Sequence, residues 1–256
     1  MKSNFHTHTY RCNHALGTDR EYVEAAVARG LEVLGFSDHS PYIFPEGYYS
    51  NFRMRPEQTP EYVSSLSALR DEFADRIKIY IGYEMEYYPL FFDKTIEHVK
   101  SVGCDFIMLG QHFPGNEIGR QPCAWPTDSK AVLTEYVDQV IEGMKTGKFF
   151  CVVHPDVICF NGDTDFYREN MRRLCKEAKR LRVPLEINLL GMRGNRHYPN
   201  EEFWRVASDV GVKVILGCDA HRPCDLAVPE NIEQGLRFAD KFNLDLTEPR
   251  KPKFIK

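Results

Sequence analysis

Three histidines lie within the segment NFHTHTYRCNH near the start of the chain, at positions 6, 8 and 14. The whole chain holds only nine histidines, so a third of them fall in this one segment. Imidazole is a common ligand of zinc, iron and manganese, whereas calcium prefers oxygen ligands. A His-x-His pair on an extended segment presents both rings on one side, because side chains alternate across a strand. The segment is therefore a candidate for half of a metal site whose other ligands lie further along the chain.

Residue types that bind metals recur at the C-terminal ends of apolar, strand-like segments. Seven of the nine histidines lie at such an end or just after it, together with one glutamate and one aspartate. A single histidine at the end of a strand is more often a structural residue that makes a hydrogen bond. The recurrence of the pattern in six segments instead predicts one shared site. Its candidate metal ligands are His6, His8, His14, His39, Glu84, His112, His154, Asp219 and His221.

Apolar runs alternate with longer amphipathic runs, and this alternation predicts parallel strands joined by crossover helices. The predicted strands cover 3–8, 32–39, 78–86, 105–113, 149–155, 184–190 and 212–221. The predicted helices cover 18–30, 60–75, 91–103, 129–147, 165–181 and 200–211. Thr18, with Glu21 three residues later, has the pattern of a capping box at the first helix. No low-complexity linker interrupts the series, so we expect a single domain over residues 1–256.

The predicted fold class is α/β, and the candidate ligands favour a distorted TIM-like (β/α)7 barrel over an open sheet. Parallel strands in a barrel bring all their C-terminal ends to one face. An open sheet gathers residues only at its switch point. A glycine lies two residues before the ligand in three strands, at Gly82, Gly110 and Gly217. We expect these missing side chains to leave room in the centre of the barrel.

The composition excludes several classes of function. The formal net charge is −4 and the basic residues are spread along the chain, so we expect no nucleic-acid partner. No apolar run reaches membrane-spanning length and no signal peptide is evident, so we expect no membrane partner. The eight cysteines form no Cys-x-x-Cys pair, which favours free thiols in the cytoplasm. The pattern leaves the oligomeric state open.

Seven motifs carry a family resemblance that extends from residue 4 to about residue 222. They read FHTHTYRCNH, GFSDHSPY, GYEMEYYP, LGQHFPG, VVHPD, EINLLGMRGNRHYP and GCDAH. Together they resemble the PHP (polymerase and histidinol phosphatase) family, and most closely its monofunctional histidinol-phosphatase branch. The fourth motif reads GQHF, where the family often has a small residue and valine before the histidine. The resemblance implies the PHP fold, a distorted barrel with about seven strands.

The resemblance also implies a cluster of three divalent metal ions, which would be zinc, iron or manganese. The implied ligand sets are His6, His8, Glu84 and Asp219 for the first metal, Glu84, His112 and His154 for the second, and His14, His39 and His221 for the third. Glu84 would then bridge the first two metals. Two metals about 3.5–4 Å apart can hold a water whose pKa falls to about 7. The expected nucleophile is therefore a metal-bridging hydroxide.

The implied reaction is the hydrolysis of L-histidinol phosphate to L-histidinol and phosphate, a step in histidine biosynthesis. Glu84, Asp219 and His221 are the expected catalytic residues, and Asp219 is a candidate relay for a proton of the bridging water. Asp38 points to the opposite side of its strand from His39, so we expect an orienting or structural role for it. The sequence has neither a Gly-x-Ser-x-Gly motif nor a glycine-rich phosphate loop that would indicate another mechanism.

Three residues at or after the sixth predicted strand are candidates for binding the substrate. Asn188 lies at the mouth of that strand. Arg193 matches the family's arginine after a glycine, and a guanidinium suits phosphate bidentately. Arg196 is its competitor in the same loop. The aromatic insertion 42–58 could form a wall or lid over the imidazole end of a substrate, or could simply pack.

Three other functions remain as alternatives. A PHP phosphoesterase could act on another small phosphate ester. A non-catalytic PHP module would be expected to lose ligand types, yet all nine positions hold competent ligands. A metal-dependent amide hydrolase often bridges its metals with a carbamylated lysine, and no predicted strand end here offers a lysine.

Overall fold

The computed structural model describes residues 1–255 and contains two parallel sheets. The first sheet has the order β1 (Ser3–Asn4), β2 (Val33–His39), β3 (Lys78–Met85) and β4 (Phe106–Leu109). The second has the order β5 (Leu185–Asn188), β6 (Lys213–Gly217) and β7 (Asp245–Leu246). Every pairing between these strands is parallel, so the strands of each sheet end on the same side.

Two seams close the sheets into one barrel. At the first seam, Val152 forms parallel bridges with Leu109 of β4 and with Leu185 of β5. At the second seam, Thr7 bridges Ala220, and the His8 amide donates a hydrogen bond to the Ala220 carbonyl at 3.0 Å. The closed arrangement gathers the C-terminal ends of the strands on one rim, as in other parallel barrels.

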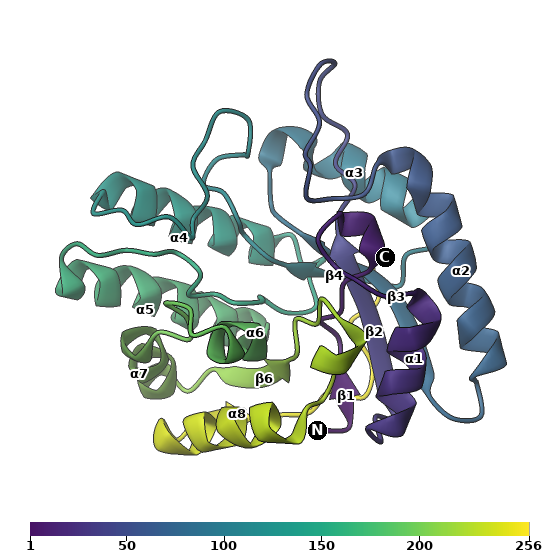
Figure 1. Cartoon of the computed structure of the whole chain (residues 1–256). Coiled ribbons are helices and arrows are strands. Elements are labelled where there is room, and N and C mark those ends of the chain that lie inside the picture. The colour runs from purple at the N-terminus through teal and green to yellow at the C-terminus, as the bar shows by residue number, and fades with distance from the viewer. Residues whose placement is uncertain (256) are drawn as a thin grey trace.

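Helices surround the barrel on its outside (Figure 1). Within residues 1–255 the α-helices are α1 (Asp19–Ala28), α2 (Thr59–Glu72), α3 (Pro89–Ser101), α4 (Lys130–Lys145), α5 (Thr164–Leu181), α6 (Leu189–Arg193), α7 (Glu201–Val210) and α8 (Pro229–Lys241). The capping box of Thr18 and Glu21 opens α1 as predicted. Short 3-10 turns lie at η1 (Tyr10–Cys12), η2 (Pro56–Gln58) and η3 (Pro223–Asp225). None of the described helices combines the length and apolar character that crossing a membrane requires.

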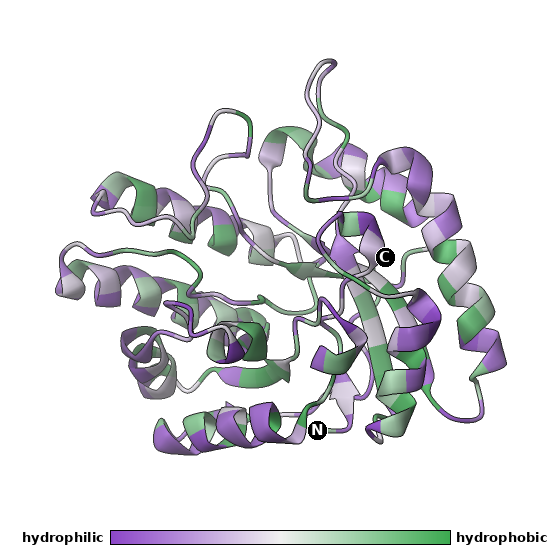
Figure 2. Ribbon diagram, viewed as in Figure 1, coloured by the Kyte–Doolittle hydropathy of each residue, from purple (hydrophilic) through white to green (hydrophobic). Residues whose placement is uncertain are grey.

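The interior of the barrel is apolar at one end and polar at the other. Its apolar floor includes the Phe5 ring, which packs against the rings of Phe106 and Phe150 with centroids 5.6 and 5.0 Å away. A larger core fills the space between strands and helices, and Figure 2 shows apolar residues in the strands and in stripes along the helices. Val33 belongs to the floor and Leu34 to the outer core, because side chains alternate along a strand. The other end of the barrel holds the polar side chains of the strand ends.

The structure corrects five of the predicted strands. The predicted strands 3–8 and 105–113 are shortened to β1 and β4, which end at Asn4 and Leu109. The segment 149–155, predicted as a strand, contributes only the bridges at Val152. The predicted strand 212–221 ends at Gly217, and the predicted strand 184–190 ends at Asn188, where α6 begins. His154 and Asp219 have positive φ angles of 31° and 47°, which an extended strand does not contain. The ligands beyond these strands therefore project from turns.

The sequence prediction omits α6, α8 and β7. Helix α6 has five residues and continues an apolar run that reads as a strand, and β7 has only two residues. Helix α8 buries little besides Gly235 and Ala239. Short elements such as α6 and β7 give a weak periodic signal, whereas α8 is clearly amphipathic and is omitted although its pattern is readable.

Gly82, Gly110 and Gly217 each leave room for a neighbouring group, as predicted, but the neighbouring group differs. A Cβ atom at Gly110 would lie 2.1 Å from Oε1 of Glu84, and one at Gly217 would lie 1.7 Å from Oε1 of Glu186. A Cβ atom at Gly82 would instead lie 2.5 Å from the Phe106 ring in the apolar floor. Two of the glycines therefore make space for buried carboxylates at the rim.

We predict that Gly110→Ala displaces the Glu84 carboxylate. We expect a loss of about 1–3 kcal/mol in stability from overpacking, together with reduced metal content after metal loading. Thermal unfolding and elemental analysis measure the two effects. Gly147→Ala is the control, because no atom lies within 4 Å of its added Cβ and its φ of 69° produces backbone strain alone. A Gly110→Ala protein that holds as much metal as the wild type would contradict the prediction.

Candidate metal centre

The Glu84 carboxylate lies at the centre of the candidate site and is 1% exposed. Strand β3 places Glu84 at the rim, in register with His39 at the end of β2. Five imidazole nitrogens surround its two oxygens. Oε2 lies 3.7 Å from His6 Nε2, 3.5 Å from His8 Nε2 and 3.1 Å from His39 Nδ1, and Oε1 lies 3.3 Å from His112 Nε2 and 2.7 Å from His154 Nε2. The two oxygens face different histidines, which is the arrangement that a bridging carboxylate requires.

The Asp219 carboxylate is the second anion of the site and is 4% exposed. Its Oδ1 atom lies 3.5 Å from His6 Nε2, 3.2 Å from His8 Nε2 and 3.3 Å from His221 Nδ1. The left-handed backbone of Asp219 ends the extended segment after β6 and turns the carboxylate toward these rings. Ligands from the first and the last ligand-bearing segments therefore meet across the second seam.

Four triads drawn from the predicted ligands have ligand atoms within 4.8 Å of one another. These are His6–His8–Asp219, His6–Glu84–His154, His8–His39–Glu84 and His14–His39–His221. The last triad is the set that the family resemblance implies for the third metal. His112 joins the group through its approach to Glu84. The structure thus brings all nine predicted ligands together at one rim.

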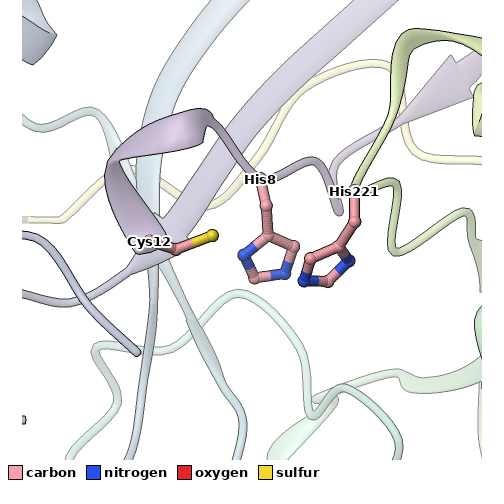
Figure 3. A group of neighbouring side chains, drawn as sticks. All are labelled: His8, Cys12 and His221. Carbon is pink, nitrogen blue, oxygen red and sulfur yellow. The ribbon is translucent and has the colours of Figure 1, made fainter. Parts of the chain in front are cut away.

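Cys12 lies beside the histidines, although the sequence did not single it out. Figure 3 shows its sulfur directed toward the His8 ring, with His221 next to that ring. Ligand atoms of the three residues lie within 4.8 Å of one another. Burial raises the pKa of the Cys12 thiol, so its proton must leave before the sulfur can bind a metal.

Several buried ligand atoms have no hydrogen-bond partner among residues 1–255. They are His6 Nε2, His8 Nδ1, His39 Nδ1, His154 Nδ1, Glu84 Oε2 and Asp219 Oδ1. A buried polar atom without a partner costs about 1–3 kcal/mol, so this concentration of such atoms indicates a further ligand that satisfies them. Imidazole nitrogens combined with carboxylate oxygens suit zinc, iron and manganese. The residues present therefore fit divalent ions of this kind.

The rings and carboxylates of the site also balance one another's charge. Burial disfavours the charged form of Glu84, but His112 and other neighbouring rings outweigh burial and hold the pKa of Glu84 well below its ordinary value. Burial also disfavours the charged form of His6, yet the carboxylates of Asp219 and Glu186 raise the pKa of His6 to about 10. Burial and a neighbouring charged histidine lower the pKa of His221 to about 3. Protons and metal ions would thus compete for the ring nitrogens.

Two buried glutamates orient metal-ligand rings through hydrogen bonds to Nδ1. This role was not assigned to them from the sequence. His6 Nδ1 donates to Glu186 Oε1 at 2.8 Å, and His112 Nδ1 donates to Glu86 Oε1 at 2.8 Å. Carboxylates that accept the second N–H of a metal-binding imidazole fix its tautomer and orientation. Glu186 lies two positions before Asn188, and Glu86 lies two positions after Glu84. Because residues i and i+2 share one side of a strand, this spacing could have placed both glutamates beside the site.

Asp38 lies near the His8 ring without a hydrogen bond to it, and a backbone carbonyl holds the His14 ring. Asp38 Oδ1 lies 3.5 Å from His8 Nδ1, and the Asp38 carboxylate also accepts a hydrogen bond from the Thr9 hydroxyl. This position agrees with the orienting or structural role expected for Asp38. The Nδ1 atom of His14 lies 2.8 Å from the Cys12 carbonyl oxygen, which leaves its Nε2 atom for a metal.

Arg193 and Arg196 both line the cavity above the ligands. Arg193, at the end of α6, donates from Nη1 to the Cys218 carbonyl at 2.6 Å and from Nη2 to the Asp219 carbonyl at 2.9 Å. These bonds hold the turn that carries Asp219. Arg196 donates from Nη1 to the Tyr198 hydroxyl at 2.7 Å. Arg193 is therefore the one of the two that lies directly against the metal-ligand turn.

We expected Asn188 to contact the substrate, but the structure does not place it in the cavity lining. It is 1% exposed. Its Oδ1 atom accepts from the Gly191 amide at 2.9 Å and so caps α6. Its Nδ2 atom donates to Glu186 at 2.9 Å and to Asp219 Oδ2 at 3.1 Å. Because these bonds occupy both ends of the amide, Asn188 positions the carboxylates of the site.

A cavity of about 880 Å³ opens above the ligands. Its lining includes the apolar residues Phe52, Phe113 and Pro122 and the charged residues Arg193, Arg196, Arg222 and Asp225. Phe52 contacts the rings of His39 and His112, whereas Arg193 contacts the Asp219 turn. A small molecule with an anionic end and an apolar end would match this lining.

Residues 4–189 match the family model of the PHP domain. The chain belongs to the PHP family. The matched span contains seven of the nine ligands, from His6 to His154. Asp219 and His221 lie beyond it, and the barrel of this PHP protein brings them to the other seven.

Two curated relatives share the histidinol-phosphatase name. A probable histidinol-phosphatase of Deinococcus radiodurans is 30% identical over 250 residues, which cover 92% of this chain and 89% of the relative. A histidinol-phosphatase of Lactococcus lactis is 30% identical over 115 residues, which cover 45% of this chain and 40% of that protein.

Two solved structures share the fold. Histidinol phosphate phosphatase from Lactococcus lactis, complexed with zinc, L-histidinol and phosphate, matches with a TM-score of 0.73 at 22% identity, covering 96% of this chain and 95% of that one. A putative histidinol phosphatase from Listeria monocytogenes matches with a TM-score of 0.72 at 19% identity, covering 88% and 97%. The predicted α/β PHP barrel is thereby confirmed.

We predict that wild-type protein purified with excess metal contains more than one equivalent of metal, and that Glu84→Gln loses at least one equivalent. The amide keeps the shape of the side chain but removes the charge and one bridging oxygen. Elemental analysis gives the metal content. Glu142→Gln, on the exposed face of α4, is the control. A single bound metal that Glu84→Gln leaves in place would rule out a cluster around Glu84.

Proposed function

We propose that this protein is a metal-dependent phosphomonoesterase that hydrolyses L-histidinol phosphate to L-histidinol and phosphate. The observation that carries the proposal is the convergence of nine metal-ligand side chains at a cavity lined by both charged and aromatic residues. The names of the relatives add support, and so does the Lactococcus lactis structure with zinc, L-histidinol and phosphate.

Three divalent cations are the proposed cofactors. We assign them to the sets His6, His8, Glu84 and Asp219; Glu84, His112 and His154; and His14, His39 and His221. Glu84 is shared because each of its oxygens faces a different group of rings. When bound, such cations activate a water as the nucleophile and offset the negative charge of the phosphoryl group.

The three proposed catalytic residues have distinct tasks. Glu84 holds the first two cation positions together through its two oxygens. The Oδ2 atom of Asp219 is occupied by the Asn188 amide, which leaves Oδ1 to bind a cation or to take a proton from the attacking water. His221 has a lowered pKa, so its ring is neutral and available as a ligand at physiological pH.

The proposed phosphate contact is Arg193. A guanidinium carries five N–H groups, and the carbonyls of Cys218 and Asp219 use two of them. The remaining N–H groups can serve phosphate oxygens beside the cations. Arg196 stays the second candidate; its guanidinium donates to the Tyr198 hydroxyl and makes no hydrogen bond to the carbonyls of the Asp219 turn among residues 1–255.

The runner-up is a PHP phosphoesterase that acts on another small phosphate ester. Its support comes from relatives of Photobacterium profundum and Aeromonas salmonicida that are named probable phosphatases, at 23% and 26% identity. Metal-loaded protein assayed against a panel of phosphate esters separates the two proposals. We predict the highest kcat/KM for L-histidinol phosphate.

The same panel carries its own controls. Asp219→Asn and His154→Ala should each lower kcat by more than the 10- to 100-fold typical of residues behind the ligands, with the fold intact by circular dichroism. Near-normal turnover in either variant at full metal content would refute the assigned ligand roles. A higher kcat/KM for a different ester would favour the runner-up.

We predict that Arg193→Ala lowers kcat/KM by about 100-fold or more, which corresponds to roughly 2.7 kcal/mol at the transition state. The variant would lose both phosphate binding and charge stabilisation as the ester bond breaks. Arg193→Lys should recover only part of the loss, because an ammonium cannot bind two oxygens in a fixed plane. Metal content must be measured beside activity, since Arg193 also holds the Asp219 turn.

Arg196→Ala is the matched control in the same loop. We expect a smaller effect, because Arg196 contacts Tyr198 rather than the ligand turn. If Arg196→Ala is far more damaging than Arg193→Ala, with metal content intact in both, the phosphate contact belongs to Arg196.

A further inference from the structure

The apolar part of the cavity lining includes two phenylalanines that stand next to metal ligands. The rings of Phe52 and Phe113 are stacked, with centroids 6.0 Å apart and planes 22° apart. Phe52 also meets the rings of His39 and His112 edge-on, at 5.2 and 6.2 Å. Both phenylalanines are only half-buried and line the cavity. An apolar surface therefore lies within ring-contact distance of the proposed second and third cation sites.

The wall has a fixed position, because a buried arginine anchors the insertion that carries Phe52. Arg53 is 1% exposed, and its guanidinium donates to Glu86 at 3.0 and 3.2 Å and to the Ser40 carbonyl at 2.9 Å. It also pairs with the buried Glu117. Breaking a buried ion pair of this kind costs about 3–5 kcal/mol, so swinging this part of the insertion outward is unfavourable.

The same arginine connects the wall to the metal centre. Glu86, which Arg53 binds, accepts the hydrogen bond of His112 Nδ1 at 2.8 Å. The Arg53 guanidinium also lies over the Phe52 ring, 4.3 Å from its centroid. The sequence left open whether residues 42–58 form a lid or a wall, and these contacts favour a wall around Phe52.

The cavity lining also contains Arg193, Arg196 and Arg222, with Asp225 3.4 Å from the Arg193 guanidinium. A phosphate group at the cations would be drawn to the arginines, since charge-assisted bonds to phosphate are strong. The alcohol part of the ester is then left with the phenylalanines.

We propose that Phe52 and Phe113 form the leaving-group wall of the site and select phosphate esters whose alcohol carries a flat aromatic ring. This inference rests on the proposed phosphatase function and adds the residues that determine its specificity. A flat ring gains contact area and ring–ring attraction on such a surface, whereas a compact polyol gains little. Neither side chain carries an atom that can bind a metal or transfer a proton, so we expect the effect on substrate binding.

Equilibrium binding tests the wall without turnover. The probes are benzylphosphonate and methylphosphonate, which share a non-hydrolysable phosphonate and differ in the ring. We expect metal-loaded wild-type protein to prefer benzylphosphonate in calorimetric titration. Phe52→Ala should reduce that preference by about three- to tenfold and leave the methylphosphonate Kd and the metal content unchanged.

Phe44→Ala is the matched control. Phe44 belongs to the same insertion but packs on Tyr42, Tyr48 and Phe91, outside the cavity lining. Phe52→Leu keeps apolar volume without a flat face, so it should lose part of the preference. It also serves as the test variant if Phe52→Ala does not fold. The wall is refuted if the Phe52 variants weaken both phosphonates equally, or if they leave the preference intact.

Kinetics separates this inference from the function on which it rests. With L-histidinol phosphate, Phe52→Ala should raise KM and change kcat little, whereas KM for glycerol phosphate should stay constant. A wild-type protein that hydrolyses no phosphate ester but retains a Phe52-dependent preference for benzylphosphonate would refute the proposed function and support the wall. Hydrolysis of L-histidinol phosphate with a KM that Phe52→Ala leaves unchanged would support the function and refute the wall.

Discussion

The buried carboxylate of Glu84 is the constraint on which the rest of the site depends. An anion that is 1% exposed is tolerated only where positive or hydrogen-bonding groups surround it, and here five imidazole nitrogens do so. Those rings come from four separate segments, so one side chain is surrounded by residues from several strand ends. The backbone accommodates it at Gly110, where any side chain would collide with the carboxylate.

A second layer of polar groups holds the ligands in place. Glu186 and Glu86 each accept an imidazole N–H, and the Asn188 amide connects Glu186 with Asp219. The layer extends outward on one side through Glu86 to Arg53, and from there to the phenylalanine wall. The His112 ligand and the anchor of the wall are therefore connected through Glu86, which binds both His112 and Arg53.

The sequence was sufficient to identify the barrel and its nine candidate ligands, because both follow from simple periodicities. Residues i and i+2 share a side of a strand, and parallel strands end together. The partner of each side chain was harder to predict, since it depends on distances across the barrel. Asn188 has the correct side and depth for a substrate contact, yet the amide of Gly191 and two carboxylates occupy it. The left-handed turns at His154 and Asp219 also escaped prediction, because neither residue is a glycine.

The seam between Thr7 and Ala220 has a consequence for how the molecule assembles during synthesis. The two residues lie more than 200 positions apart, so the barrel cannot close until almost all the ligand-bearing chain has left the ribosome. Pairings of such long range are slow to form, because loop-closure entropy is lost before the contact is gained. Until then, the histidines of the first segment lack the carboxylate of Asp219. A cation that needs Asp219 as a ligand would therefore bind only after the two ends of the barrel wall have met.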